Sequence, residues 1–160
     1  MPMQTQQVDF MQKYGARAAA ANEALKDAPV DTGFMRLPQG IKNGIAKLQV
    51  MTVKRQEEDG KKIPKGEPFF RAAAVVIYPL THGGVRCEGL QTSQVVALCD
   101  VPAKGQRKAA TFEDGYADMQ NLIRLCGIPA CPETKASDPT GQKQQAYWYA
   151  AMRTLTDPAR

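Results

Sequence analysis

Phe69 and Arg71 stand two residues apart in the apolar stretch 68–78, which holds no other charged residue. In an extended strand, alternate residues face the same side, so the ring and the guanidinium share one face. An arginine beside an exposed ring can hold a phosphate and a stacked base together. The same arginine can equally be a salt-bridged edge residue over an ordinary core. The pair therefore predicts a nucleic-acid contact, with ordinary packing as the alternative.

A second group of rings and a cation lies near the end of the chain. Residues 146–156 combine alanine and methionine with Tyr-Trp-Tyr and two threonines, and we predict a strand there. In that strand Tyr147, Tyr149 and Arg153 face outward. The inward residues are Trp148, Ala150 and Met152.

Basic residues are concentrated in the part of the chain that is predicted to form a sheet. The formal charge is +5, and residues 42–108 hold twelve basic side chains against six acidic ones. Such a distribution favours a polyanionic partner, although a basic protein without one has the same composition. The predicted nucleic-acid-binding residues are Lys47, Lys54, Arg55, Lys61, Lys62, Lys65, Phe69, Arg71, Arg86, Tyr147, Tyr149 and Arg153.

Catalytic chemistry has few candidates in this sequence. His82 is the only histidine, and Cys87 follows it across a turn, which is weak evidence for a nucleophile pair. No phosphate-binding glycine loop or dinucleotide fingerprint occurs. We therefore predict no enzyme activity, no catalytic residue and no cofactor. A zinc site remains the alternative, because Cys126 and Cys131 have four residues between them.

Two regions are expected along the chain. Residues 8–26 have apolar residues at helical spacing and many alanines, which predicts a helix with a weak point at Gly15. The thin apolar stripe of this helix must pack on the rest of the chain or on a neighbouring copy, so a homo-oligomer is one expectation. Residues 27–40 form a linker. The division is a helical arm and linker over 1–37 and a second domain over 38–160.

The second domain has the pattern of a small, mainly β protein of the α+β class. Strands are predicted over 41–54, 68–78, 85–90 and 92–100, with Ala46, Leu48 and Val50 on one side of the first. A helix follows, with Thr111 and Asp114 as its capping residues and Gly127 just after its end. The strand at 146–156 completes the order β-β-β-β-α-β. This order predicts a small closed OB-like barrel, although open α+β sheets also fit.

Three motifs give the chain a family resemblance. They are Pro-x-Gly-Ile-x-x-Gly at 38–44, Lys-Gly-Glu-Pro-Phe at 65–69, and Leu-Ile-Arg-Leu-Cys-Gly-Ile at 122–128. In this order, over residues 38–155, the chain resembles the OB-fold single-stranded-DNA-binding proteins encoded by bacteriophages. The resemblance implies binding of displaced single strands of DNA in replication or recombination, without sequence preference and without catalysis. Single-stranded RNA is the alternative partner. The alanine-rich N-terminal helix is not part of that pattern.

The remaining expectations concern location and the second function class. No run approaches the roughly 18 apolar residues of a membrane span, and the first residues lack the features of a secretion signal. We therefore expect no membrane partner and a cytoplasmic protein whose four cysteines are thiols. The alternative function is a structural or assembly protein, of a virion or a self-associating oligomer, with no role in nucleic-acid binding.

Overall fold

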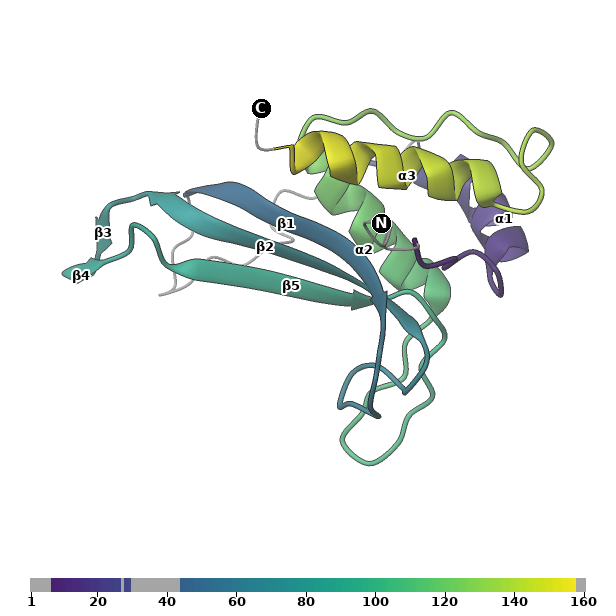
Figure 1. Cartoon of the computed structure of the whole chain (residues 1–160), viewed down its shortest axis with the longest axis horizontal. Helices are drawn as coiled ribbons and strands as arrows, with labels where there is room; N and C mark the ends of the chain where they lie inside the picture. The colour runs from purple at the N-terminus through teal and green to yellow at the C-terminus, as the bar shows by residue number, and fades with distance from the viewer. Residues whose placement is uncertain (1–6, 27, 30–43, 158–160) are drawn as a thin grey trace, which may run out of the picture.

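The described chain folds into an antiparallel sheet with helices on one face. The computed structural model describes residues 7–26, 28–29 and 44–157. Within them the elements are α1 (Gly15–Lys26), β1 (Ile45–Arg55), β2 (Pro68–Tyr78), β3 (Thr81–His82), β4 (Val85–Arg86), β5 (Gln91–Ala97), α2 (Phe112–Leu125) and α3 (Gln142–Leu155). The sheet has the order β1-β2-β5, and β3 and β4 form a separate hairpin. Helices α2 and α3 lie against one face of the sheet (Figure 1).

Strand β2 is the centre of the sheet, and its prediction is confirmed. It runs over residues 68–78 and pairs with β1 on one side and β5 on the other. Phe70, Ala72, Ala74 and Val76 are buried on one side of the strand, while the residues between them face the opposite side. Phe70 and Ala72 pack in the cluster that includes residues of α2 and α3, whereas Val76 packs on Cys87 and Leu90. The segment forms a strand because β-branched and aromatic side chains pack well on a pleated, half-buried surface.

Strand β1 differs from the prediction by a bulge. Its pairing with β2 shifts between Leu48 and Val50, so Gln49 is an extra residue on the β1 side. A one-residue insertion reverses which side chains face the core. Val50 therefore lies opposite Ala73 on the outer face, although it was predicted to face the same side as Leu48. Beyond the bulge, the inward residues are Met51 and Val53, both buried.

Helix α2 begins and ends as predicted. The Thr111 side chain accepts a hydrogen bond from the Asp114 backbone N–H at 3.2 Å, which satisfies one of the unpaired N–H groups at the helix start. Gly127, just after the helix, has a φ of 98°, a conformation that favours glycine. The buried stripe runs from Phe112 to Ile123 and packs on the sheet.

Helix α1 exists but starts later than predicted. Residues 10–14 form turns, and the regular helix begins at Gly15. It contacts α2, and Asn22 donates hydrogen bonds to the carbonyls of Cys131 and Glu133. Phe10 and Met11, which precede it, belong to the same buried cluster as the sheet residues. The first region thus packs on the rest of the chain. The predicted boundary at 37/38 lies outside the described residues.

The strand predicted over 146–156 is wrong, because this segment is helix α3. Residues 144, 148 and 152 repeat every four positions and are all buried, which is the period of a helix. Trp148 Nε1 donates to the Tyr116 hydroxyl at 3.0 Å, and that hydroxyl hydrogen-bonds Gln144. Burial of this helical face outweighs the strand preference of Tyr-Trp-Tyr.

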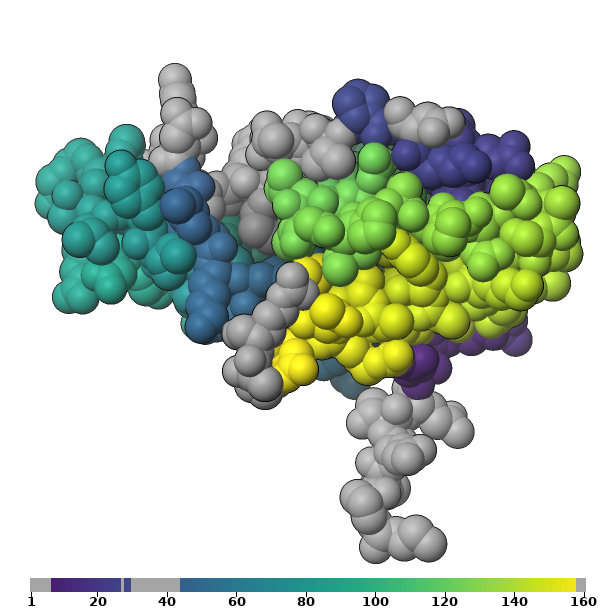
Figure 2. Space-filling model, turned by 90° about the horizontal axis from the view of Figure 1, so that it is seen from above, coloured from purple at the N-terminus to yellow at the C-terminus, as the bar shows by residue number. Residues whose placement is uncertain are grey.

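The closed OB-like barrel is also wrong. The strand that would have completed it is α3, so in the part of the chain that the structure describes β1 and β5 are the edges of an open three-stranded sheet. The fold is α+β, with helices layered on one face of the sheet. Seen from the helix side, α3 lies in front, and the β3–β4 end of the sheet extends beyond the helices (Figure 2). No helix within the described ranges is long and apolar enough to cross a bilayer.

Helix α2 lies unusually close to the end of β5 at Gly115. A Cβ atom on Gly115 would be 1.8 Å from the carbonyl oxygen of Ala97, far closer than any van der Waals contact. Only glycine therefore allows this approach of helix to strand. The contact fixes α2 across the end of β5 and shapes the surface beside that strand.

Candidate nucleic-acid interface

The sheet has one face that carries the Phe69–Arg71 pair and that no described helix covers. Phe69 lies opposite Lys54 of β1 and Ala97 of β5, and Arg71 lies opposite Thr52 and Val95. Phe69 is half-buried and Arg71 is exposed. Because Ala97 is small, the ring has no bulky neighbour on the β5 side. The predicted ring and guanidinium therefore share one accessible face.

Three cations lie on this face. Lys54 is opposite Phe69 and lies beside the Phe69–Arg71 pair, whereas Lys47 is opposite Val75 and lies farther along the same face of β1. With Arg71, they form no ion pair with a described residue. The remaining residues of the face are uncharged: Thr52, Val50, Ala73, Val75, Gln91, Ser93, Val95 and Ala97. We call this set of residues, with the three cations and Phe69, the open face.

The loop cations have two different roles. Arg55 donates to the carbonyls of Gly66 and Asp9, so it holds the loop after β1 in place. Lys61, Lys62 and Lys65 are exposed and make no ion pair within the described chain. They remain available to an anion.

Arg107 joins the two loops at this end of the sheet, a role that the sequence did not indicate. Its side chain is only 7% exposed, and Nη2 lies 2.6 Å from Asp59 Oδ1 and 2.8 Å from the Gly60 carbonyl. The Arg107 hydrogen bond holds the pKa of Asp59 below its usual value. Residues 101–110 are thereby fixed against residues 55–67.

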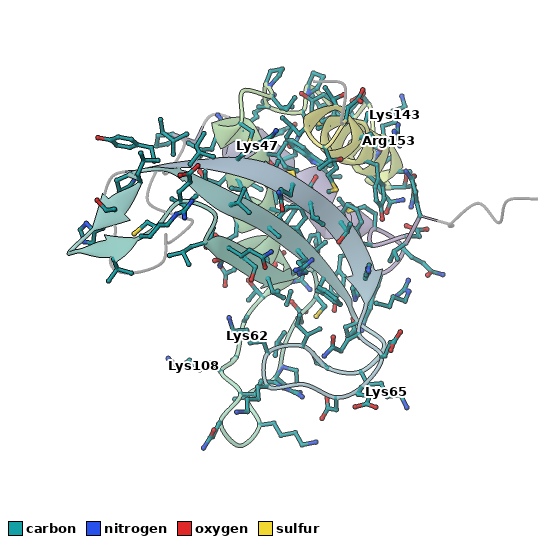
Figure 3. All side chains as sticks on the ribbon, turned by 60° about the vertical axis from the view of Figure 1, so that its left-hand side comes forward. Lys47, Lys62, Lys65, Lys108, Lys143 and Arg153 are labelled. Carbon is teal, nitrogen blue, oxygen red and sulfur yellow. The ribbon has the colours of Figure 1, made fainter. Side chains whose placement is uncertain are left out.

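A groove of about 510 Å³ lies between these loops, the edge of β5 and the start of α2. We call it the β5 groove. Its strand wall is Gln94, Val95, Val96 and Ala97, and its helix wall includes Asp114, Gly115 and Asp118. Lys61, Lys62 and Lys108 line it from the two loops. Lys62 and Lys108 extend from these loops on the side of the sheet away from α3 (Figure 3). Lys108 was not among the predicted binding residues.

The other predicted residues lie elsewhere. Tyr147, Tyr149 and Arg153 are on α3, on the covered side of the sheet (Figures 1 and 3). Tyr149 is buried and its hydroxyl donates to the Val8 carbonyl at 2.7 Å, while the Tyr147 hydroxyl donates to the carbonyl of Pro129. Arg86 is on β4, 3.8 Å from Glu88. The structure therefore brings Lys47, Lys54, Phe69 and Arg71 together but separates them from the rings of α3.

A polar cluster links α1 to the start of α2. Arg17 pairs with both Asp100 and Glu113, and Asp100 also accepts the Phe112 backbone N–H at 2.9 Å. These hydrogen bonds hold the pKa of Asp100 at about 2 and lower that of Glu113. Tyr14 stacks on the Phe112 ring and lies under the Arg17 guanidinium. The cluster is structural. Its ion pairs occupy Arg17, Asp100 and Glu113, for which the sequence predicted no role.

The thiols lie in apolar surroundings. Cys87, Cys99 and Cys131 are buried, and burial raises the pKa of Cys99 to about 11 and that of Cys131 above its usual value. The Cys87 thiol donates to the Val85 carbonyl, while His82 is exposed on β3. Among the described residues, no three histidine, cysteine or acidic side chains come together as metal ligands.

Comparisons of the chain with protein-family models, curated proteins and solved structures found no match.

Proposed function

We propose that this chain is a non-enzymatic protein that binds single-stranded DNA through its open face. One observation carries the proposal: Phe69 and Arg71 project from the central strand onto a sheet face that no described helix covers, with Lys54 directly opposite the ring. A flexible polyanion needs cations for its phosphates and flat surfaces for its bases. The open face supplies both on adjacent residues.

Two kinds of residue would contribute to the binding free energy: a ring that stacks on a base and cations that contact phosphates. A base stacked on Phe69 contributes about 1–3 kcal/mol. Arg71, Lys54 and Lys47 neutralise phosphates along the strand and release counterions, so affinity must fall as salt rises. The uncharged remainder of the face offers no hydrogen-bonding side chain beyond Thr52, Ser93 and Gln91. Binding is therefore expected to depend little on base sequence.

The setting follows from the ligand. Displaced single strands occur in replication and recombination, which are the processes that the phage-protein resemblance implies. The protein would act in the cytoplasm, where its cysteines stay reduced. RNA single strands offer the same phosphates and bases, so we expect the open face to bind them as well.

Fluorescence anisotropy of a labelled oligo-dT tests the proposal. The wild-type protein should bind at low salt, and Phe69→Leu should raise Kd by about 5- to 150-fold, the equivalent of one stacked base. Tyr147→Leu is the matched control, because it removes a partly exposed ring from the opposite side of the sheet. Absence of binding by the wild-type protein, or equal losses in the two variants, refutes the proposal. A labelled oligo-rU in the same titration measures the preference for DNA.

Self-association is a second candidate function, and one observation favours it. Ile45, Ile77, Tyr78, Leu80 and Val85 are large apolar side chains that are 46–58% exposed, and all lie at the β3–β4 end of the sheet. Such a concentration of exposed apolar groups is typical of a protein contact surface. Light scattering across protein concentrations should then show an oligomer without nucleic acid, which Leu80→Lys disrupts. A monomer at all concentrations rules this function out.

A further inference from the structure

Strand β5 has one edge whose backbone groups are unpaired within the described chain. The Leu98 N–H donates to the Pro68 carbonyl at 3.0 Å, and the Val76 N–H donates to the Leu90 carbonyl at 2.9 Å. In an antiparallel ladder, hydrogen-bonded pairs alternate with pairs whose N–H and C=O groups point outward. The even-numbered residues of β5 therefore bond to β2. The backbones of Gln91, Ser93 and Val95 face away from the sheet.

The β5 groove runs along this edge. Gln94 to Ala97 form its strand wall, and the close approach of Gly115 to the Ala97 carbonyl closes the edge at that point. Unpaired strand edges readily accept another strand. An added strand would thus bond to the backbones of Gln91, Ser93 and Val95, and its end would enter the groove.

The two sides of the groove differ in charge. Lys61, Lys62 and Lys108 lie on the loop side, and none is in an ion pair with a described residue. Asp114 and Asp118 belong to the α2 wall on the helix side. Successive side chains of an added strand point to opposite faces. One set would face the lysines and the other set would face α2.

We propose that the β5 edge binds an extended peptide of another protein as an additional strand, with acidic residues at every second position. The acidic set faces Lys61, Lys62 and Lys108, and the alternate set is uncharged because it faces Asp114 on the α2 wall. Main-chain hydrogen bonds supply affinity, and the charge difference between the two sides of the groove sets the register. The proposal does not depend on DNA binding, because it uses the edge of the sheet rather than the open face.

Amide hydrogen exchange, followed by NMR, tests this proposal. The probe is a nine-residue peptide with blocked ends in which glutamate alternates with threonine. It should slow exchange of the Ser93 and Val95 amides about tenfold or more. Gln94 and Val96 are internal controls, since their N–H groups already bond to β2. The same peptide with every amide N-methylated keeps its charges and carbonyls, but its methyl groups prevent its backbone from pairing with a strand edge, so it should not protect any of these amides.

Two variants separate the edge from the charges. Ser93→Pro removes an outward N–H without removing a hydrogen bond to β2, so the fold should survive and peptide protection should be lost. The double variant Lys61→Ala with Lys62→Ala should raise the Kd of the peptide, while Phe69→Leu should leave it unchanged. The last comparison distinguishes failure of this proposal from failure of DNA binding.

Three results overturn the proposal. Equal protection by the N-methylated peptide would show that charge alone binds it. Protection of Ser93 and Val95 that grows with protein concentration, without peptide, would identify a second copy of the chain as the occupant. Protection of the same amides by oligo-dT would assign the groove to nucleic acid.

Discussion

Replacing Arg71 by glutamine should weaken binding of single-stranded DNA and also reduce its dependence on salt. Three cations lie on the open face, namely Lys47, Lys54 and Arg71, and none is in an ion pair with a described residue. Each phosphate neutralised on a single strand contributes about 0.7 to the slope of log affinity against log salt. The wild-type slope should be about −2, and the slope of Arg71→Gln about −1.4.

Phe69→Leu should behave differently, because it removes a ring and no charge. Its affinity should be lower by about 5- to 150-fold at every salt concentration, with the wild-type slope unchanged. The assay is anisotropy of labelled oligo-dT between about 50 and 200 mM salt. The two variants therefore separate stacking from phosphate contact on one surface.

Two results would refute this reasoning. If Arg71→Gln kept the wild-type slope, Arg71 would not contact a phosphate. If the wild-type slope were about −4, some six cations would take part. Lys61, Lys62 and Lys108 of the β5 groove would then have to contact phosphates as well, and the open face alone would not be the DNA-binding site.

The remaining predictions concern stability. Gly115→Ala should lower the free energy of unfolding by about 1–3 kcal/mol, because its Cβ would be 1.8 Å from the Ala97 oxygen. Helix propensity alone predicts a gain of about 1 kcal/mol, so a stabilised variant in denaturant unfolding would contradict the close contact. Asp100→Asn should cost about 1 kcal/mol or less, since Arg17 and Asp100 remain 41% and 48% exposed and water screens the pair. The pKa of Asp100 is about 2 in the folded protein against a usual 3.8, so this stabilisation is present above about pH 4 and is lost as pH falls through 2. The difference in stability between wild type and Asp100→Asn should vanish over that range in thermal unfolding, and a constant difference would show that the carboxylate charge is not involved.

The sequence predicts those elements whose local pattern and burial agree. Strand β2 has unbroken β propensity between breaking residues, and its two faces follow from alternation alone. Helix α2 has a cap at Thr111, an apolar stripe and a terminal glycine, and all three signals appear in the structure. Where propensity, pattern and boundary residues point to the same element, a single sequence is enough.

Helix α3 shows where this approach fails. Tyr-Trp-Tyr favours a strand locally, but the segment is held as a helix by contacts with Tyr116, which is 28 or more residues away in the chain. The bulge in β1 fails for a related reason. Its position depends on which residues of β1 meet Ala73 and Ala74 of β2, and alternation within one strand does not show this. Both errors arise from pairing partners that are distant in sequence.

The groove lay beyond prediction because its parts are far apart in the chain. Arg107 and Asp59 read as members of two ordinary charged loops, yet their ion pair places Lys108 beside Lys61 and Lys62. Composition revealed the excess of positive charge between residues 42 and 108 but not which cations are consumed within the fold. Arg55 and Arg107 form hydrogen bonds within the fold, whereas Lys47, Lys54 and Arg71 are in no ion pair with a described residue.

Whether the sheet is open or closed does not change the position of the open face, but it does change whether β1 and β5 have edges that a partner can bind. Alternation places Phe69 and Arg71 on the side away from the helices whether or not the sheet closes. In a closed barrel, however, β1 and β5 would each have a second neighbour and no free edge. Because residues 142–155 form a helix instead, the backbones of Gln91, Ser93 and Val95 have no strand partner among the described residues. The helical conformation of residues 142–155 therefore explains both why the barrel prediction is wrong and why β5 has an edge to which we propose that a peptide strand binds.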